Sequence, residues 1–280
     1  MASYQSAKAG RSSATANLGL GWLFAPAAIL FVAFISVPLA ALVWRALDSG
    51  ELSNNLTSSL VLDALRLSAI TSTVTLAIAV ILGTPLAYVL ARYEFPGKAF
   101  VDLMVDLPIV LPPTVAGVAL LVAFGRRGVV GEYLDDWGLT IGFTTTAVVL
   151  AQLFVSAPFY IRTVKAGIEA VEPMYEGVAW TLGASPLRAF FRITLPLAWP
   201  SIVAGAILCW ARALSELGAT LIFAGNFQGR TQTMPLAIIS AFDSGKSIDV
   251  PIALSVILVA AAAILLLLLR VLAGRTRYAV

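Results

Sequence analysis

The first long apolar stretch of the chain, residues 22–44, reads WLFAPAAILFVAFISVPLAALVW and has no charged residue in 23 positions. A helix that rises about 1.5 Å per residue needs about 20 apolar residues to cross the hydrocarbon core of a bilayer. Lys8 and Arg11 precede the stretch, as they would in a secretory signal. However, the run is too long for the apolar core of a signal peptide, and no small-x-small cleavage site follows it. We therefore interpret it as a membrane span.

The composition of the whole chain is that of a membrane protein. Of its 280 residues, 60% are apolar and 12% are charged, whereas about 25% of the residues of a soluble domain are charged. Cys209 is the single cysteine and there is no histidine, so a disulfide framework, a His/Cys metal site and a histidine-based catalytic triad are excluded. Cys209 lies in an apolar run and is interpreted as a packed small residue. We expect no cofactor, no bound metal and no nucleic-acid partner.

Apolar windows of membrane-spanning length recur along the chain. We predict six transmembrane helices, at about 22–44, 67–91, 103–125, 140–161, 196–224 and 250–270. Only helices satisfy their own backbone hydrogen bonds within lipid, so the predicted fold class is an all-α membrane protein. A shorter apolar piece, Met234–Phe242, is expected to be an interfacial or re-entrant helix. Residues 1–17 and 275–280 are expected to be a flexible cytoplasmic N-terminus and a cytoplasmic tail.

The positive charges predict that both termini face the cytoplasm. With the N-terminus inside, eleven of the 18 Lys and Arg residues fall in cytoplasmic segments and six in outer ones, while Arg212 lies within a span. Cytoplasmic loops of membrane proteins carry an excess of Lys and Arg. Arg126 and Arg127 fall on the outer side, against this bias. The prediction is a multi-pass protein of the cytoplasmic membrane.

The longest predicted cytoplasmic loop, residues 162–195, has the pattern of a helical hairpin. Apolar residues recur at near-helical spacing between Ile168 and Leu182. Gly183 is a predicted helix stop, and Ser185-Pro186 is predicted to begin a second short helix with proline in its first turn. The apolar side of such a hairpin needs a partner, which could be the bilayer surface, the bundle itself or another protein.

Residues 176–196 of this loop read EGVAWTLGASPLRAFFRITLP and resemble the coupling motif of permease subunits of ATP-binding-cassette importers. That family has Glu-Ala-Ala before a glycine, and Ile-x-Leu-Pro after it. Gly183 matches the glycine, and residues 193–196 match the second part at the family spacing. Gly177 stands where the family has glutamate, and Glu176 lies one position earlier. The resemblance implies that the ATPase is coupled through Glu176, Gly177, Ala179, Gly183, Ala184, Ser185, Ile193, Leu195 and Pro196.

Two further regions resemble molybdate permeases in particular. Residues 107–117 (LPIVLPPTVAG) and Gly125-Arg-Arg-Gly128 are similar to their third span and outer loop. Residues 211–235 are similar to their fifth span and exit loop. Sulfate permeases share the Ala-Arg-Ala-Leu…Glu core at 211–216, but lack the Gly-Arg-Arg-Gly loop and differ at 229–235. The resemblance implies an importer of molybdate or tungstate, with sulfate or thiosulfate as the alternative substrates.

The resemblance also implies an architecture and a set of partners. It implies the type I importer permease fold, with a transmembrane permease domain at residues 18–274. A separate ABC ATPase would bind on the cytoplasmic side, an extracytoplasmic oxyanion-binding protein would deliver the substrate, and a second permease copy would complete a homodimer in the lipid membrane. The chain itself would be a non-catalytic transport subunit.

The sequence is also compatible with other classes of protein. A membrane anchor or an intramembrane enzyme could use the same loop to recruit a soluble partner. A secondary transporter should show internal repeats and more protonatable groups at mid-membrane than Arg212 and Glu216. Residues 240–247 end like a phosphate-binding loop, but Ser240 stands in place of its first glycine. We therefore expect that this chain does not bind ATP.

Polar and helix-breaking residues within the predicted spans are candidates for the oxyanion path. Arg212 and Glu216 have the i, i+4 spacing that lets two side chains pair on one helix face, and an ionisable residue at membrane depth by default marks a functional site. A purely structural ion pair is the equal alternative. Prolines and a glycine interrupt the third span, where broken helices expose backbone amides that suit an anion. The candidates for the path or its gate are Pro112, Pro113, Thr114, Gly117, Arg212, Ser215 and Glu216.

Two other sets of polar residues are given structural roles. Asp102 and Asp106 are expected to be solvated carboxylates near the cytoplasmic end of the third span. The hydroxyl and amide groups of the fourth span are expected to support helix packing rather than line a wet path; they belong to Thr144, Thr145, Thr146, Gln152 and Ser156.

Overall fold

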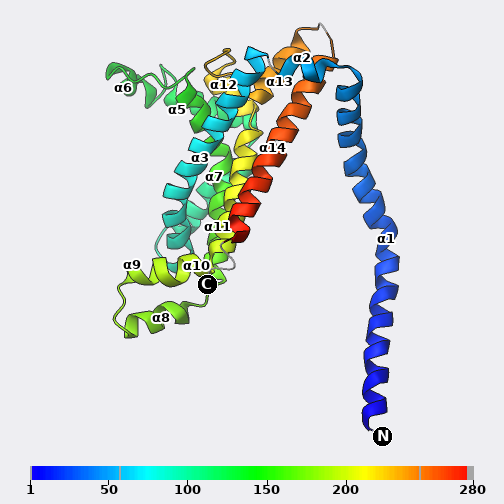
Figure 1. The fold of residues 1–280 in the computed structure, drawn as a ribbon. Helices are drawn as coiled ribbons and strands as arrows, with labels where there is room; N and C mark the ends of the chain where they lie inside the picture. The colour runs from blue at the N-terminus through cyan, green and yellow to red at the C-terminus, as the bar shows by residue number, and fades with distance from the viewer. Residues whose placement is uncertain (1, 57, 246, 276–280) are drawn as a thin grey trace.

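The computed structural model describes residues 2–56, 58–245 and 247–275, and in these ranges every regular element is a helix (Figure 1). The helices are α1 (Ala2–Asp48), α2 (Glu51–Leu56), α3 (Ser59–Arg92), α4 (Lys98–Val110), α5 (Pro113–Phe124), α6 (Gly131–Asp136), α7 (Thr145–Glu169), α8 (Pro173–Thr181), α9 (Pro186–Ala189), the π-helix η1 (Phe190–Thr194), α10 (Leu195–Leu197), α11 (Trp199–Leu214), α12 (Gly218–Ala224), α13 (Met234–Asp243) and α14 (Asp249–Arg275). The predicted all-α class is therefore confirmed.

The centre of the molecule is made by α3, α7 and α11, which pack side by side (Figure 1). Their shared core includes Leu90, Tyr160, Val164 and Ile202, all nearly or fully buried. The helices approach closely where side chains are small: a Cβ added to Gly167 of α7 would lie 2.2 Å from the Cβ of Ser201 in α11. Small residues at such contacts are typical of helix packing within membranes.

The lengths of the helices fit a membrane protein. Among the described residues, three helices are long and apolar enough to cross a membrane, and up to five if each of two bent pairs counts as one span. The bent pairs are α4–α5, with an angle of 120°, and 186–197 with α11, with an angle of 72°. The predicted number of six spans stays a prediction.

Two of the predicted spans are interrupted by breaks. The third changes direction between α4 and α5, at Leu111 and Pro112, where the prolines of the sequence predicted an interruption. The fifth was expected to run without a break to residue 224, and this expectation is wrong. Helix α11 ends at Leu214 and α12 begins at Gly218. The carboxylate of Glu216 accepts a hydrogen bond from the backbone N–H of Ala219 at 2.8 Å, so it caps the new helix instead of continuing the old one.

Helix α1 stands apart from the bundle. Figure 1 shows it running beside the other helices with a wide separation, and it meets α2 and α14 only near its C-terminal end. Arg45 forms an ion pair with Asp249 at 3.1 Å at that end. None of the most apolar window within Phe24–Asp48 is buried. Helix α1 therefore presents an apolar surface that lipid or another protein must cover.

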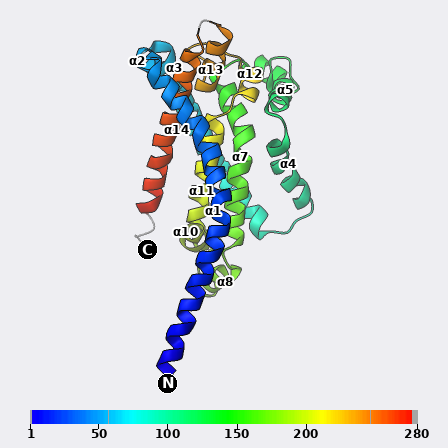
Figure 2. The same cartoon turned by 90° about the vertical axis from the view of Figure 1, so that its right-hand side faces the viewer.

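The molecule has two distinct ends. Helices α8 and α9 form one end, where the start of α1 and the last described turns of α14 also lie (Figure 1). Helices α2, α5, α6, α12 and α13 lie at the opposite end, and Figure 2 shows α4 and α5 at the margin of the bundle. The start of α1 falls within the segment 1–17 that we predicted to be flexible; alanine, the strongest helix former, occupies five of its positions. Of the predicted tail 275–280, all but Arg275 lies outside the described residues.

Candidate functional site

The helical hairpin predicted in residues 162–195 is formed by α8 and α9. Helix α8 ends in a Schellman motif: Gly183 has φ +81°, and the N–H of Ala184 donates to the carbonyl of Ala179 at 2.9 Å. Ser185 begins α9, because its hydroxyl accepts a hydrogen bond from the N–H of Arg188 at 3.3 Å. The helix stop and the helix start that the sequence predicted are both confirmed.

A π-helix, η1, joins the hairpin to the bundle. The N–H of Leu195 donates to the carbonyl of Phe190, five residues earlier. Pro196 follows and has no N–H to give to the carbonyl of Arg192, which favours the wider turn. Thr194 is fully buried while Arg192 is exposed. Single π-turns within α-helices are frequent at functional sites.

The hairpin presents a broad apolar surface. Its exposed large side chains are Met174, Tyr175, Val178, Trp180, Leu182, Leu187 and Phe191. Exposed apolar patches of this kind mark protein–protein or membrane interaction sites. A Cβ added to Gly177, where the importer pattern has glutamate, would meet nothing within 4 Å.

The predicted coupling residues divide by exposure. The exposed ones are Gly183, Ser185 and Pro196; the half-buried ones are Gly177, Ala184, Ile193 and Leu195; the buried ones are Glu176 and Ala179. The exposed residues lie at the turn of the hairpin and at the start of α10. The two buried residues belong to α8, which packs against α9 and η1.

Glu176 points into the protein. Its Oε1 accepts hydrogen bonds from Arg92 Nε at 3.1 Å and from the hydroxyl of Thr194 at 2.6 Å. The side chains of Arg92 and Glu176 are 9% and 4% exposed. Arg92 Nη2 also donates to the carbonyl of Val171 at 2.8 Å. Sequence reasoning missed Arg92, because no local spacing links it to a residue 84 positions further along the chain.

Arg212 and Glu216 pair as the sequence predicted, but at a helix break. Arg212 Nη2 lies 2.7 Å from Glu216 Oε2, and the two side chains are 26% and 1% exposed. The other carboxylate oxygen of Glu216 caps α12 through Ala219. Ser215, between the two helices, donates its hydroxyl to the carbonyl of Arg212 at 3.1 Å. The buried carboxylate therefore has a cation on one oxygen and a backbone N–H on the other.

The structure brings the path candidates of the third predicted span close to those of the fifth. Gly117 of α5 lies on α12, where an added Cβ would be 2.8 Å from Ile222 Cβ and 2.9 Å from Ala219 Cα. A Cβ on Gly218 would similarly be 2.9 Å from Pro113 Cβ. The starts of α5 and α12 are thus in direct contact. Of the remaining candidates here, Pro112, Pro113 and Thr114 are exposed.

Asp102 and Asp106 are partly exposed, at 23% and 38% of their side-chain surface, but they are also ion-paired, which the sequence did not indicate. Lys165 Nζ lies 2.7 Å from Asp102 Oδ1, and Arg162 pairs with both Asp102 and Asp106. The side chain of Lys165 is only 10% exposed. The ion pairs were not expected because the cations come from α7, far along the chain from α4. The network fastens α4 to α7.

The predicted packing role of the polar residues in α7 is confirmed for two of them. The hydroxyl of Thr75 donates to Gln152 at 3.2 Å, and Ser156 accepts from the buried thiol of Cys209 at 3.5 Å. Thr144 caps α7, since its hydroxyl accepts from the N–H of Ala147 at 3.3 Å. Thr145 donates to the carbonyl of Arg230 at 2.9 Å. The role of Thr146 stays a prediction.

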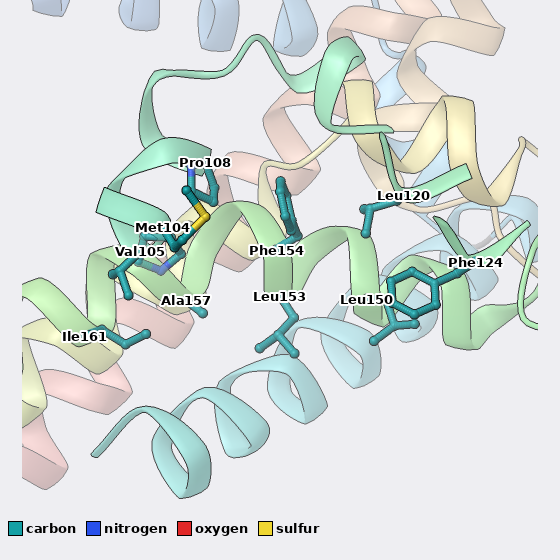
Figure 3. Close-up of a pocket in the computed structure, with 11 residues that line it drawn as sticks. Met104, Val105, Pro108, Leu120, Phe124, Leu150, Leu153, Phe154, Ala157 and Ile161 are labelled. Carbon is teal, nitrogen blue, oxygen red and sulfur yellow. The ribbon is translucent and has the colours of Figure 1, made fainter. Parts of the chain in front are cut away.

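The bend between α4 and α5 leaves an apolar cavity against α7. Its volume is about 320 Å³, and side chains such as Met104, Leu120, Phe154 and Ile161 point into it (Figure 3). An oxyanion would be poorly solvated among these groups. Within the described part of the chain, no group of three or more Cys, Asp or Glu residues could hold a metal ion.

Comparison with known proteins gives concordant similarities. The family described as "Binding-protein-dependent transport system inner membrane component" matches residues 79–278. The chain is 42% identical over 238 residues to the molybdenum transport system permease protein ModB of Mycobacterium tuberculosis, covering 85% of this chain and 89% of the relative. It is 42% identical over 256 residues to the molybdate/tungstate transport system permease protein WtpB of Thermococcus kodakarensis, covering 91% and 96%.

The fold is also similar to that of a solved transporter. A crystal structure of a bacterial alginate ABC transporter, in complex with an alginate-bound periplasmic protein, contains a chain that superposes with a TM-score of 0.73. The alignment covers 92% of this chain and 96% of that chain, at 18% identity. At this identity the likeness concerns the fold alone.

Proposed function

We propose a function from one premise: the chain belongs to the family of binding-protein-dependent transport system inner membrane components. On this premise it is the membrane-spanning permease subunit of an ATP-driven importer, and its substrate is molybdate or tungstate. Relatives named for transport of molybdenum, molybdate or tungstate match 85% and 91% of the chain at 42% identity. ATP hydrolysis would be carried out by a separate subunit. The observation that carries this proposal is the hairpin of α8 and α9, with its defined turn and its exposed apolar surface.

The hairpin is the proposed docking site of the ABC ATPase. A soluble ATPase can move a membrane bundle only through an element that is stiff and that fits a groove on its surface. The Schellman turn at Gly183 and the cap at Ser185 fix the angle between the two short helices. Exposed aromatic and aliphatic side chains, Trp180 and Leu187 among them, provide the apolar contact area.

The break between α11 and α12 is the proposed gate of the oxyanion path. Molybdate is a dianion, and an anion at membrane depth needs a cation or polar donors to offset its desolvation. Arg212 supplies a cation whose side chain is 26% exposed. If Arg212 turned from Glu216 toward the anion, the carboxylate of Glu216 would still accept its hydrogen bond from the N–H of Ala219. Pro112, Pro113, Thr114, Gly117 and Ser215 are the proposed neighbours of this gate.

A second permease copy is proposed to complete the pathway. The apolar surface of α1 is unburied within one chain, so a helix of a partner chain or lipid must cover it. We place the hairpin end in the cytoplasm, together with both ends of the chain, in agreement with the distribution of Lys and Arg. The opposite end would then receive an extracytoplasmic oxyanion-binding protein.

Competition for uptake tests the substrate. Cells that carry the permease with its ATPase and binding protein would take up labelled molybdate, and unlabelled tungstate or sulfate would be added in excess. We expect tungstate to compete and sulfate to have no effect. Equal competition by sulfate would favour the sulfate/thiosulfate alternative, and uptake in vesicles that lack any ATPase would refute the importer.

A further inference from the structure

We propose that Arg92, Glu176 and Thr194 form an internal joint, the hairpin clamp, which carries movement of the α8–α9 hairpin into α3. Glu176 is then a positioning residue that acts inside the permease, and it is not a contact of the ATPase. This inference rests on the proposed function, because it requires an ATPase that moves the hairpin.

The clamp joins three elements at one oxygen atom. Glu176 belongs to α8, Arg92 is the last residue of α3, and Thr194 is the last residue of η1. Both donors reach Glu176 Oε1, Arg92 at 3.1 Å and Thr194 at 2.6 Å. A second bond from Arg92, to the carbonyl of Val171 at 2.8 Å, holds the segment between α7 and α8. Movement of α8 therefore has to displace α3 or break these bonds.

Burial makes the joint stiff. Hydrogen bonds between ionised groups are about twice as strong as neutral ones, and the side chains here are 9% and 4% exposed, so water competes poorly for them. Removing one partner would leave the other as an uncompensated buried charge, which is strongly unfavourable. By contrast, the pair Lys98–Glu94 near the same end has a glutamate that is 88% exposed, and exposed pairs contribute little.

Thr194 reaches the clamp from the last position of the π-turn, which is closed by a bond between residues five positions apart. Leu195 donates to Phe190 across this wide turn, and Thr194 lies fully buried beside Glu176. The ring of Phe190 also meets that of Tyr88 in α3 edge-to-face, with centroids 4.9 Å apart. Helix α3 and η1 are thus joined twice.

Helix α3 connects the clamp to the other end of the molecule. It runs without interruption for 34 residues, which corresponds to roughly 50 Å at the rise of an α-helix. Near its far end the buried Ser68 accepts a hydrogen bond from the N–H of Met234, at the start of α13, at 2.8 Å. In between, the hydroxyl of Thr75 shares its single proton between two acceptors in α7, the side chain of Gln152 at 3.2 Å and the carbonyl of Val149 at 3.3 Å. The clamp therefore acts on a helix that reaches both ends of the bundle.

The test uses the complete importer, with its ATPase and binding protein, reconstituted in liposomes. The variants are Glu176→Gln, Arg92→Gln, the double variant of both, and Thr194→Val; Glu94→Gln is the matched exposed control. Three quantities are measured: co-purification of the ATPase, ATP hydrolysis, and molybdate uptake per ATP hydrolysed. The double variant removes both buried charges, so assembly is expected to recover even where a single variant fails to fold.

We expect the ATPase to remain bound in Thr194→Val and in the double variant. Uptake per ATP should fall in the double variant by roughly 5- to 150-fold, the usual range of coupling between two sites, and by less in Thr194→Val. The control should match the unaltered chain. A purely structural clamp would instead let the double variant recover normal uptake per ATP along with assembly, and that result would overturn the inference.

A second result would also overturn the inference that the clamp couples the hairpin to α3. If Glu176→Gln alone lost the ATPase while Arg92→Gln and Thr194→Val kept both the ATPase and normal coupling, Glu176 would be an ATPase contact. An unaltered importer that takes up molybdate without hydrolysing ATP would refute the proposed function, and the clamp with it. Normal coupling in every variant would refute the clamp alone.

Discussion

Replacing Gly117 with alanine tests the contact between α5 and α12 at the proposed gate. An added Cβ would lie 2.8 Å from Ile222 Cβ, 2.9 Å from Ala219 Cα and 2.9 Å from the carbonyl oxygen of Ala219, whereas ordinary contacts begin at 3.4 Å. The two helices must therefore separate by about 0.6 Å, the difference between 3.4 Å and the shortest of these distances, 2.8 Å. Two of the three atoms are backbone, so no side chain can simply turn away.

Overpacking of this kind typically costs about 1–3 kcal/mol, and Gly117→Ala should destabilise the protein by that amount. The added methyl group would press on Ala219, whose N–H donates to Glu216 at 2.8 Å, so the start of α12 would be strained and uptake should fall as well. Thermal unfolding of the detergent-solubilised protein measures the stability. Gly177→Ala is the matched control, because its Cβ would meet nothing within 4 Å; alanine within a helix should leave stability unchanged or raise it by about 0.5–1 kcal/mol. Equal stability of Gly117→Ala and the unaltered chain would refute the close contact.

Three further predictions concern the charged groups. Arg212→Gln should destabilise the protein more than Glu216→Gln does, by about 1–3 kcal/mol, because the glutamate left behind is 1% exposed and the arginine is 26% exposed; thermal unfolding of both variants checks the order. Asp102→Asn should cost about 1–2 kcal/mol in the same assay, since it leaves the 10% exposed Lys165 without its carboxylate at 2.7 Å, and an unchanged midpoint would contradict the network. A hydrogen bond from the guanidinium of Arg126 holds the pKa of Asp135 below its ordinary value. The ion pair is therefore complete at neutral pH. Its contribution to stability is lost only as the pH falls below about 3.9, the value in the unfolded chain, and through the lower pKa of the folded state. Carbon-13 NMR of the labelled carboxylate should give that lowered pKa, and an ordinary one would contradict it.

The sequence was most informative where the signals are local. Gly183 and Ser185 predicted the turn of the hairpin correctly, because a left-handed residue and a helix cap depend on only a few neighbouring residues. The i, i+4 spacing of Arg212 and Glu216 predicted their pairing, which is also local. The break between them was not predicted, because a glutamate can either continue a helix or cap the next one.

Contacts between distant segments were beyond the sequence. Glu176 meets Arg92 across 84 positions, and Lys165 meets Asp102 across 63. Neither pair has a spacing that a single helix would produce, and one sequence holds no other record of which helix faces meet. The inward direction of Glu176 is set by its hydrogen bonds to Arg92 of α3 and Thr194 of η1. For the same reason the sequence could not separate the exposed coupling residues of the hairpin from the buried ones, and both were predicted as one set.

The clamp and the proposed gate are connected by two routes of different kinds. Through Arg92, the hairpin acts on α3, which packs along α7 and reaches α13 by way of Ser68. Through Thr194, it acts on η1, which continues along the chain through α10 and α11 to Arg212 and the break before α12. The first route depends on non-covalent bonds, and the second follows the backbone around a bend of 72°. Loss of the clamp charges should therefore weaken the first route more than the second. Reconstituted importers with Arg92→Gln and Glu176→Gln together should keep some opening at Arg212 while α13 no longer follows. The proposed gate would then open without movement of the end where we place the binding protein.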